Sequence, residues 1–170
     1  MNANELKVIY DLYGSLVFNL CCHYLRDKMD AEEVTQDVFL KVFEKTVDFR
    51  EEAAFKTWVY RITINRCIDR LRQKRRREIL SIFIPIDIPT TDYAYHPGLK
   101  MESNEAVQSL LKAIEKLPDR QKTALILNKI EGMPVAEVAT VLKLELKAAE
   151  SLIFRGKVSL RKILDGQAND

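Results

Sequence analysis

Residues 55–77 read FKTWVYRITINRCIDRLRQKRRR, and this segment constrains the fold and the surface of the chain more than any other. Its apolar side chains form two series with steps of three and four residues, which is typical of the buried side of an α-helix; they are Phe55, Trp58 and Ile62, and then Ile64, Ile68 and Leu71. From Arg61 onward, eight arginines and lysines share the segment with one acid, Asp69. The sequence therefore predicts a helix over about 54–78 that packs on one side and presents a strongly basic surface on the other.

The same periodicity predicts two helices before this segment. Apolar residues from Leu6 to Tyr24 predict a first helix over about 4–27. The stretch Asp30-Ala-Glu-Glu33 resembles a capping box and predicts the start of a second helix, with valines at 34, 38 and 42 on one stripe. Residues 1–80 therefore form a predicted three-helix module.

The middle of the chain has a different composition. Residues 81–107 carry one basic and four acidic side chains, and they hold Pro85, Pro89, Pro97 and Gly98. The segment shows no sustained hydrophobic period. We expect residues 81–105 to form a flexible, acidic linker.

Residues 106–170 predict a second module of four shorter helices. Pro118 ends the first helix, and Asp119 caps the next, which runs to Gly132. Pro134 opens a brief helix that ends at Leu142, and the last helix runs from Glu145 to about residue 164. A short break between two helices suggests a helix-turn-helix. The predicted fold class is all-α, with two small helical domains joined by the linker.

The last helix has two distinct faces. The inward face is predicted to contain Leu146, Ala149, Ile153, Gly156, Leu160 and Ile163, and the opposite face presents Lys147, Glu150, Ser151, Phe154, Arg155 and Lys157. Phe154 is unusual because a large apolar ring stands there among polar neighbours. Two interpretations stay open: the ring contacts thymine methyl groups or sugar edges in a major groove, or the helix is rotated and Phe154 belongs to the core.

Little in the composition points to an enzyme or to a metal site. The three cysteines, Cys21, Cys22 and Cys67, have no metal-ligand spacing, so buried free thiols are expected. No glycine-rich phosphate loop is present, and His23 and His96 lie far apart in the sequence. We expect no catalysis, no cofactor and no metal. The chain has neither a membrane-spanning run nor a signal peptide, which predicts a cytoplasmic location.

Two pairs of motifs resemble a known family. EEVTQDVFLKVFEK followed by FKTWVYRITINRCIDRLR resembles region 2 of the extracytoplasmic-function class of bacterial sigma factors. LPDRQKTALILNKIEGMPVAEVATVL with AAESLIFRGKVSLRK is similar to region 4 of the same class. The likeness covers about residues 8–80 and 106–165 in the expected order. It implies a protein that directs core RNA polymerase to promoters and helps to open them.

The resemblance implies roles for both modules toward promoter DNA. By likeness, the residues that contact the −10 element are Arg61, Asn65, Arg66 and Arg70, with Arg72–Arg77 along phosphates and with Phe49 and Arg50 as the walls of a flipped-base pocket. The −35 element would be contacted by Lys147, Glu150, Ser151, Phe154, Arg155 and Lys157. The alternative for the basic run is a solvated helix end. For Trp58, a core position is favoured over a stacking platform because it shares a stripe with Ile62.

The resemblance also implies protein partners. Glu33, Gln36 and Asp37 match positions that grip the clamp helices of the polymerase β′ subunit, and Phe43 adds an apolar contact. Without the family, acids near the start of a helix only complement its dipole. An anti-sigma factor, often membrane-bound, is the other expected partner and would hold the chain at the inner membrane; no small-molecule substrate is expected.

This chain departs from the family pattern in the turn before its last helix. Lys143 and Glu145 stand where relatives usually have a glycine and then a serine or threonine. Lys143 would be strained in a left-handed conformation, and glutamate is a weaker cap. The alternative function that stays open is a helix-turn-helix regulator that acts without binding core polymerase.

Overall fold

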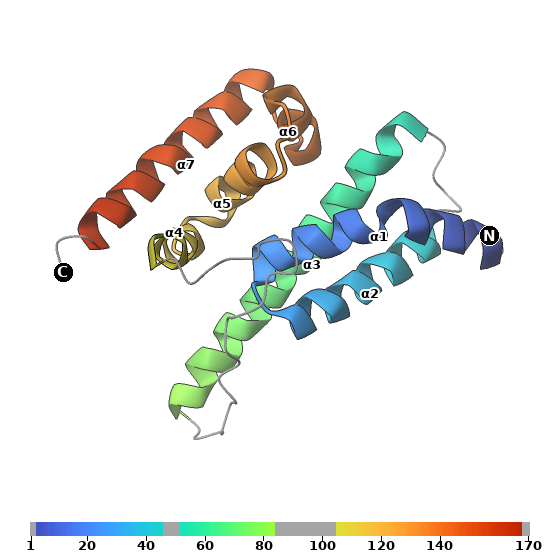
Figure 1. The fold of residues 1–170 in the computed structure, drawn as a ribbon, viewed down its shortest axis with the longest axis horizontal. Coiled ribbons are helices and arrows are strands. Elements are labelled where there is room, and N and C mark those ends of the chain that lie inside the picture. Colours follow the sequence, from blue (N-terminus) through green and yellow to red (C-terminus); the bar gives the residue numbers. More distant parts are fainter. Residues whose placement is uncertain (1–2, 46–51, 84–104, 168–170) are drawn as a thin grey trace. The chain divides into compact units, whose positions relative to one another are not determined.

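The computed structural model describes residues 3–45, 52–83 and 105–167, and every regular element in these ranges is helical. The chain divides into two compact units, residues 1–98 and 99–170 (Figure 1). Across the described ranges, none of the helices is both long and apolar enough to span a bilayer. The predicted all-α fold with two helical domains is confirmed.

The first unit is a bundle of three helices, in which each helix packs on the other two: α1 (Ala3–Leu25), α2 (Lys28–Lys45) and α3 (Glu52–Phe83). Buried side chains from all three helices form its core; they are Val17, Leu20 and Tyr24 of α1, Val34, Val38 and Val42 of α2, and Val59, Ile64 and Cys67 of α3. Figure 1 shows the green end of α3 extending past α1 and α2. Helix α3 therefore presents both a packed face and an unpacked end.

Helix α2 begins two residues earlier than the sequence predicted. Arg26 ends α1 in the left-handed region, with φ of 56°. The side chain of Asp27 then caps α2, because its Oδ1 accepts a hydrogen bond of 2.9 Å from the backbone N–H of Asp30. The prediction that Asp30 starts the helix is wrong, and Asp30 is instead buried within the first turn.

Helix α3 is longer than predicted, and its inward face is rotated slightly from the predicted one. It ends at Phe83 rather than near residue 78. Val59 and Thr63 are fully buried, whereas Ile62 is only half-buried. Trp58 is also half-buried, with its ring 5.4 Å from that of Phe55, so it lies at the edge of the core.

The three cysteines lie inside the first unit as free, buried thiols, as predicted. The Cys67 thiol donates a hydrogen bond to Cys21 Sγ over 3.7 Å, which links α3 to α1. Burial raises the pKa of Cys22 from 9.0 to about 11, and the neighbouring Cys21 adds to this shift. The Cys22 thiol is therefore protonated at neutral pH and a poor nucleophile.

The second unit contains α4 (Glu105–Glu115), α5 (Asp119–Leu125), a π-helical turn η2 (Ile126–Ile130), α6 (Val135–Leu142) and α7 (Leu146–Gln167). Helix α7 packs on α4, α5 and α6. Gly132 has φ of 67° and ends the α5–η2 segment where the sequence predicted. At Gly156, an added Cβ would lie 3.0 Å from Cγ of Leu125, so this glycine permits the close crossing of α7 over α5.

The residues predicted to cap helices in the second unit are Asp119 and Glu145. Asp119 is the first residue of α5 and Pro118 is its N-cap without a side-chain bond, so the prediction that Asp119 caps this helix is wrong. Glu145, in contrast, directly precedes α7, and its carbonyl accepts a hydrogen bond of 3.0 Å from the N–H of Ala149. The break between α6 and α7 is therefore where the helix-turn-helix pattern predicted it.

Lys143 adopts the left-handed conformation that the sequence comparison with the family suggested would be costly. Its φ and ψ are 54° and 50°, and it forms the C-cap of α6. A side chain with a Cβ is strained in this region, which glycine occupies readily. The turn nevertheless closes, since the N–H of Leu144 donates to the carbonyl of Ala139 over 2.9 Å.

We expect the substitution Lys143→Gly to stabilise the second unit. A non-glycine residue in this region costs about 1–3 kcal/mol, and the extra chain entropy of glycine offsets about 0.4–1 kcal/mol. The net gain in the free energy of unfolding should be about 1 kcal/mol, measured by urea denaturation of the full chain. Lys157→Gly, within helix α7, is the matched control and should destabilise by about 1 kcal/mol. If the Lys143→Gly protein is less stable than the original, the claim that Lys143 is strained in the left-handed conformation is wrong.

Candidate nucleic-acid interface

Helix α7 presents the polar face that its sequence predicted. Its six candidate side chains are all exposed: Lys147, Glu150, Ser151, Phe154, Arg155 and Lys157. Phe154 is 66% exposed, so the alternative that places it in the core is wrong. Leu146, predicted to face inward, is 48% exposed, and Leu152 is buried instead. The face is thus rotated slightly relative to the prediction, and the aromatic ring stays on it.

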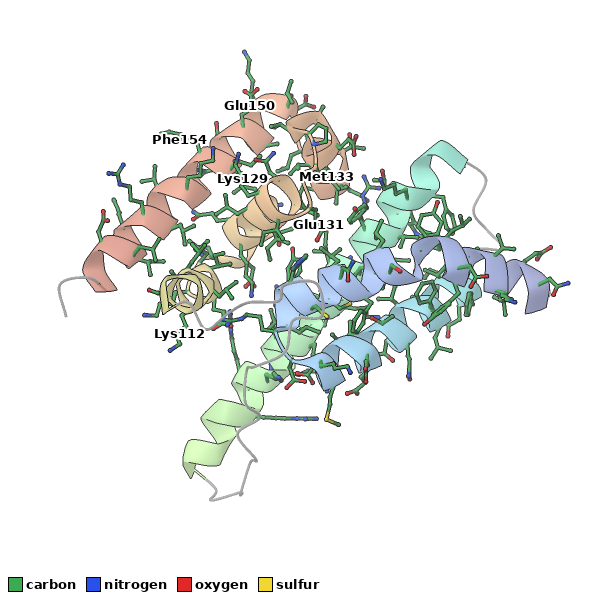
Figure 2. The ribbon with its side chains drawn as sticks, viewed as in Figure 1. Lys112, Lys129, Glu131, Met133, Glu150 and Phe154 are labelled. Carbon is green, nitrogen blue, oxygen red and sulfur yellow. The ribbon has the colours of Figure 1, made fainter. Side chains whose placement is uncertain are left out.

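Four of these side chains border one shallow hollow on α7: Glu150, Ser151, Phe154 and Arg155. Figure 2 shows Glu150 and Phe154 projecting from the side of α7 opposite α5. Arg155 folds back along the helix, where its Nε–H donates to the carbonyl of Ser151 over 3.3 Å. An apolar ring beside a hydroxyl, a carboxylate and a guanidinium is the set of groups that discriminates base edges in a major groove.

Six of the basic side chains of α3, together with Asn65, lie in two rows. The outward row runs along the unpacked side of the helix and contains Arg61, Asn65, Arg72 and Arg76, of which only Arg61 is half-buried. The inner row contains Arg66, Arg70 and Lys74, which are spaced four residues apart and are all half-buried. The two rows meet different surroundings, which the sequence alone did not separate.

Arg70 and Lys74 of the inner row pack against acids at the start of α2. We call this set the α2–α3 charge cluster: Asp27, which directly precedes α2, Asp30 and Glu33 of α2, and Arg70 and Lys74 of α3. Both Nε and Nη2 of Arg70 donate to Oδ1 of Asp30, over 2.9 and 2.7 Å. Arg70 also donates to both carboxylate oxygens of Glu33. Lys74 pairs with the other oxygen of Asp30 and lies 3.8 Å from Oδ2 of Asp27.

The electrostatics agree with this geometry. Burial lowers the pKa of Arg70, but the hydrogen bond and the charge of Asp30, together with Glu33, outweigh it and raise that pKa above its ordinary value. Toward the other end of α2, the hydrogen bond from Lys41 is the main cause that lowers the pKa of Glu44, and the charge of Arg66 adds to it. Arg66 and Arg70 therefore both act on acids of α2.

Arg70 was predicted to face duplex DNA, and its surroundings oppose that role. Its guanidinium already meets two carboxylates, and its side chain is only 19% exposed. To reach a phosphate it would have to leave Asp30 behind in a buried position, which is costly. Sequence reasoning missed Asp30 because its partner lies 40 residues away. No spacing rule within one helix indicates such a pair.

The predicted polymerase-binding residues lie along α2. Glu33, Gln36 and Asp37 are exposed, and Glu33 is shared with the charge cluster. Phe43 is half-buried, with its ring 6.0 Å from that of Phe39. Leu40, which the sequence reasoning did not name, is 60% exposed. Leu40 is apolar but lies outside the stripe of buried valines, and this feature of the sequence could have identified it as a surface contact.

Phe49 and Arg50, the predicted walls of a flipped-base pocket, lie outside the described residues. Residues 84–104, which make up most of the predicted linker, do so as well, whereas residues 81–83 belong to α3 and Glu105 begins α4. Both stay predictions from the resemblance.

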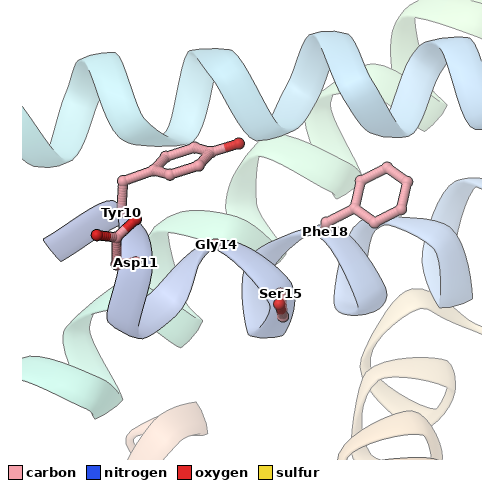
Figure 3. A pocket seen from close by; sticks show the side chains of 5 residues that line it. All are labelled: Tyr10, Asp11, Gly14, Ser15 and Phe18. Carbon is pink, nitrogen blue, oxygen red and sulfur yellow. The ribbon is translucent and has the colours of Figure 1, made fainter. Parts of the chain in front are cut away.

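A second shallow hollow lies on α1 and is lined by Tyr10, Asp11, Gly14, Ser15 and Phe18 (Figure 3). The rings of Tyr10 and Phe18 extend toward α2, where Tyr10 contacts Phe39 with ring centroids 4.8 Å apart. The lining offers one carboxylate and one aliphatic hydroxyl with neither a histidine nor a cation beside them. This combination does not form the nucleophile and base pair of a hydrolytic site.

Comparisons with known proteins match both units. Residues 9–77 match the family Sigma-70 region 2, and residues 107–160 match Sigma-70 region 4. The ECF RNA polymerase sigma factor SigW of Bacillus subtilis is 29% identical over 162 residues, which cover 92% of this chain and 87% of the relative. The ECF RNA polymerase sigma-E factor of Haemophilus influenzae is also 29% identical over 162 residues, with 92% and 85% covered.

Solved structures show the same fold. The sigma factor RpoE of Bartonella quintana, crystallised with the anti-sigma factor NepR, superposes with a TM-score of 0.70 at 23% identity, covering 96% of this chain and 98% of that one. CnrH, in complex with the cytosolic domain of CnrY, gives a TM-score of 0.66 at 23% identity, with 97% and 90% covered.

Two helical units with these faces, matching regions 2 and 4 in order, define a sigma-70-type transcription initiation factor. More narrowly, the chain belongs to the extracytoplasmic-function sigma factors. Its function is that of the family, to direct RNA polymerase to promoters, and the resemblance inferred from the motifs is confirmed. The match of the first unit to region 2 disfavours a regulator that uses the helix-turn-helix alone.

Proposed function

We propose that α2 binds core RNA polymerase, that the outward row of α3 recognises the −10 element, and that the exposed face of α7 recognises the −35 element. One observation carries this assignment: each unit contains a long helix with a packed face and an exposed face on which cations lie beside a side chain suited to a base edge, Asn65 on α3 and Phe154 on α7. In this proposal residues 1–80 serve as region 2, residues 81–105 as the linker and residues 106–170 as region 4, with region 2 continuing to the end of α3 at Phe83.

For the −10 element, Asn65 is the base-reading residue. It is exposed on the outward row, and an amide can donate to and accept from adenine at the same time. Arg61 and Arg72, one or two turns away, are suited to phosphates, which fix position without reading sequence. Phe49 and Arg50 complete the proposal as the pocket for a flipped base.

For the −35 element, the hollow on α7 supplies the chemistry. Phe154 offers an apolar surface for a thymine methyl, and Glu150 can accept from the amino group of cytosine. Ser151 and Arg155 add donors, while Lys147 and Lys157 extend the cationic surface toward phosphates. The acid at position 150 gives this face its own sequence preference.

The free chain cannot open a promoter by itself. A bubble of about five steps costs roughly 7 kcal/mol, at about 1.4 kcal/mol for each stacking step. Stacking one or two flipped bases on the protein returns only about 2–6 kcal/mol. Core polymerase must supply the remaining binding energy, so sequence-specific opening belongs to the holoenzyme.

The proposal includes partners and a location. RNA polymerase and promoter DNA set the place of work in the cytoplasm, and the chain acts there by binding, without a reaction of its own. An anti-sigma factor is the proposed restraint, supported by the complexes in which similar folds were crystallised.

We expect the substitution Asp37→Lys to remove core binding. It places a cation on the proposed clamp-binding surface, and like charges across an interface cost several kcal/mol, so the affinity should fall by more than about a hundredfold. Asp11→Lys on α1 makes the same charge change at another exposed acid and should bind core normally. Fluorescence titration with core polymerase measures both, and circular dichroism checks that the helices persist. Normal binding by Asp37→Lys would remove α2 from the proposal.

Asn65→Ala and Arg155→Ala should each weaken initiation without weakening assembly with core. Loss of one base contact costs about 1–3 kcal/mol, so run-off transcription at limiting promoter should fall by roughly 5–150-fold. Run-off on genomic templates, with and without the chain, tests the function itself. Arg120→Ala, at an exposed position of α5, is the control for a lost positive charge. Reduced core binding by Asn65→Ala would mean that the faces of α3 and α2 are assigned wrongly.

A further inference from the structure

The α2–α3 charge cluster joins the proposed polymerase-binding helix to the proposed −10 helix. Asp27, directly before α2, and two acids within α2 meet two cations of α3 in this cluster. One of these acids, Asp27, also caps α2 through the N–H of Asp30. These contacts therefore fix the start of α2 to the middle of α3.

Arg70 contacts two acids that differ in exposure. The side chain of Asp30 is 9% exposed and that of Glu33 is 59% exposed. The guanidinium is planar and carries its donors in a fixed fork, so binding two carboxylates at once sets both the position and the rotation of the helix that carries it. A lysine at this position would provide one point charge and no fork.

The two partners belong to different surfaces. Glu33 is one of the residues proposed to bind polymerase, while Arg70 lies on the same rigid helix as Asn65, little more than one turn away. Packing of the valine stripe on α2 resists separation of the helices, but apolar contacts alone permit small rotations about the helix axis. The fork at Arg70 is the directional contact that opposes such rotation.

We propose that Arg70 is a positioning residue for promoter opening: bridged to Asp30 and Glu33, it holds the outward row of α3 toward DNA when α2 is bound to polymerase. This inference rests on the functions proposed above for α2 and α3. It replaces the predicted phosphate contact of Arg70 with a contact inside the protein. The raised pKa of Arg70 agrees with a cation held by two acids.

The test is a double-mutant cycle on open-complex formation by holoenzyme, with Arg70→Met, Asp30→Asn and the double variant. Opening is measured by the fluorescence of a base analogue in the −10 element, at saturating core and at a temperature where each variant is folded. Each single variant should open the promoter about tenfold less, within the ~5–150-fold range of coupling between sites. The double variant should be no worse than Arg70→Met, because both remove the same bridge.

Salt dependence separates positioning from direct DNA contact. Removal of a phosphate contact lowers the slope of log K against log salt by about 0.9. We expect the slope for Arg70→Met to equal that of the original protein. A slope lowered by about one unit would overturn the inference in favour of a direct DNA contact. So would losses in promoter opening by Asp30→Asn and Arg70→Met that multiply in the double variant.

The same experiment distinguishes the positioning role of Arg70 from a purely structural one. It would lower the melting temperature and leave opening by the folded, core-bound protein unchanged. Arg72→Met, which breaks a pair with Asp69 at 4.0 Å on the exposed side of α3, controls for a lost arginine in melting experiments. If Arg70→Met does not fold, the Asp30→Asn variant is the test. Normal promoter opening by this variant overturns the inference, and a tenfold loss of opening at unchanged affinity for core supports it. An original protein that gives no promoter-dependent opening overturns the proposed function as well.

Discussion

The contact between Arg70 and the acids of α2 is the constraint on which the arrangement of the first unit depends. Asp30 is buried, so its charge must be compensated, and Arg70 and Lys74 compensate it from α3. Loss of one partner from a fully buried ion pair costs about 3–5 kcal/mol. The cost is smaller here because both cations keep some exposure to solvent. Helix periodicity places Asn65 about 140° from Arg70 around α3, so the outward row faces away from the acids that Arg70 contacts.

Each unit provides one of the two proposed DNA-binding surfaces. In the first unit, α2 and α3 divide acidic and basic surfaces between them. In the second, close packing at Gly156 sets α7 against α5 while Phe154 remains on the exposed face. In the proposed function, core polymerase holds both surfaces at one promoter. This role fits a chain whose overall charge is nearly balanced while its charged side chains are concentrated on separate surfaces.

Much of this was predictable because helical periodicity and punctuation are local signals. The units, the break at Lys143 and the exposed face of α7 followed from spacing, glycine and proline alone. The prediction that Asp30 caps α2 was wrong because Asp27, three residues earlier, takes that role, and α2 starts where its hydrogen bond can form. The ion pairs of Arg70 were missed for a different reason: its partners lie 37 and 40 residues away, and one sequence does not reveal which face of a basic helix meets an acid.

The central claim is that α2 and the outward row of α3 serve different partners from one rigid bundle. A photoreactive amino acid introduced at Gln36, and separately at Asn65, tests it in a complex of the chain with core polymerase and promoter DNA. Crosslinks from position 36 to a polymerase subunit and from position 65 to the −10 DNA are the predicted pair. Crosslinks from both positions to the same partner would contradict the account.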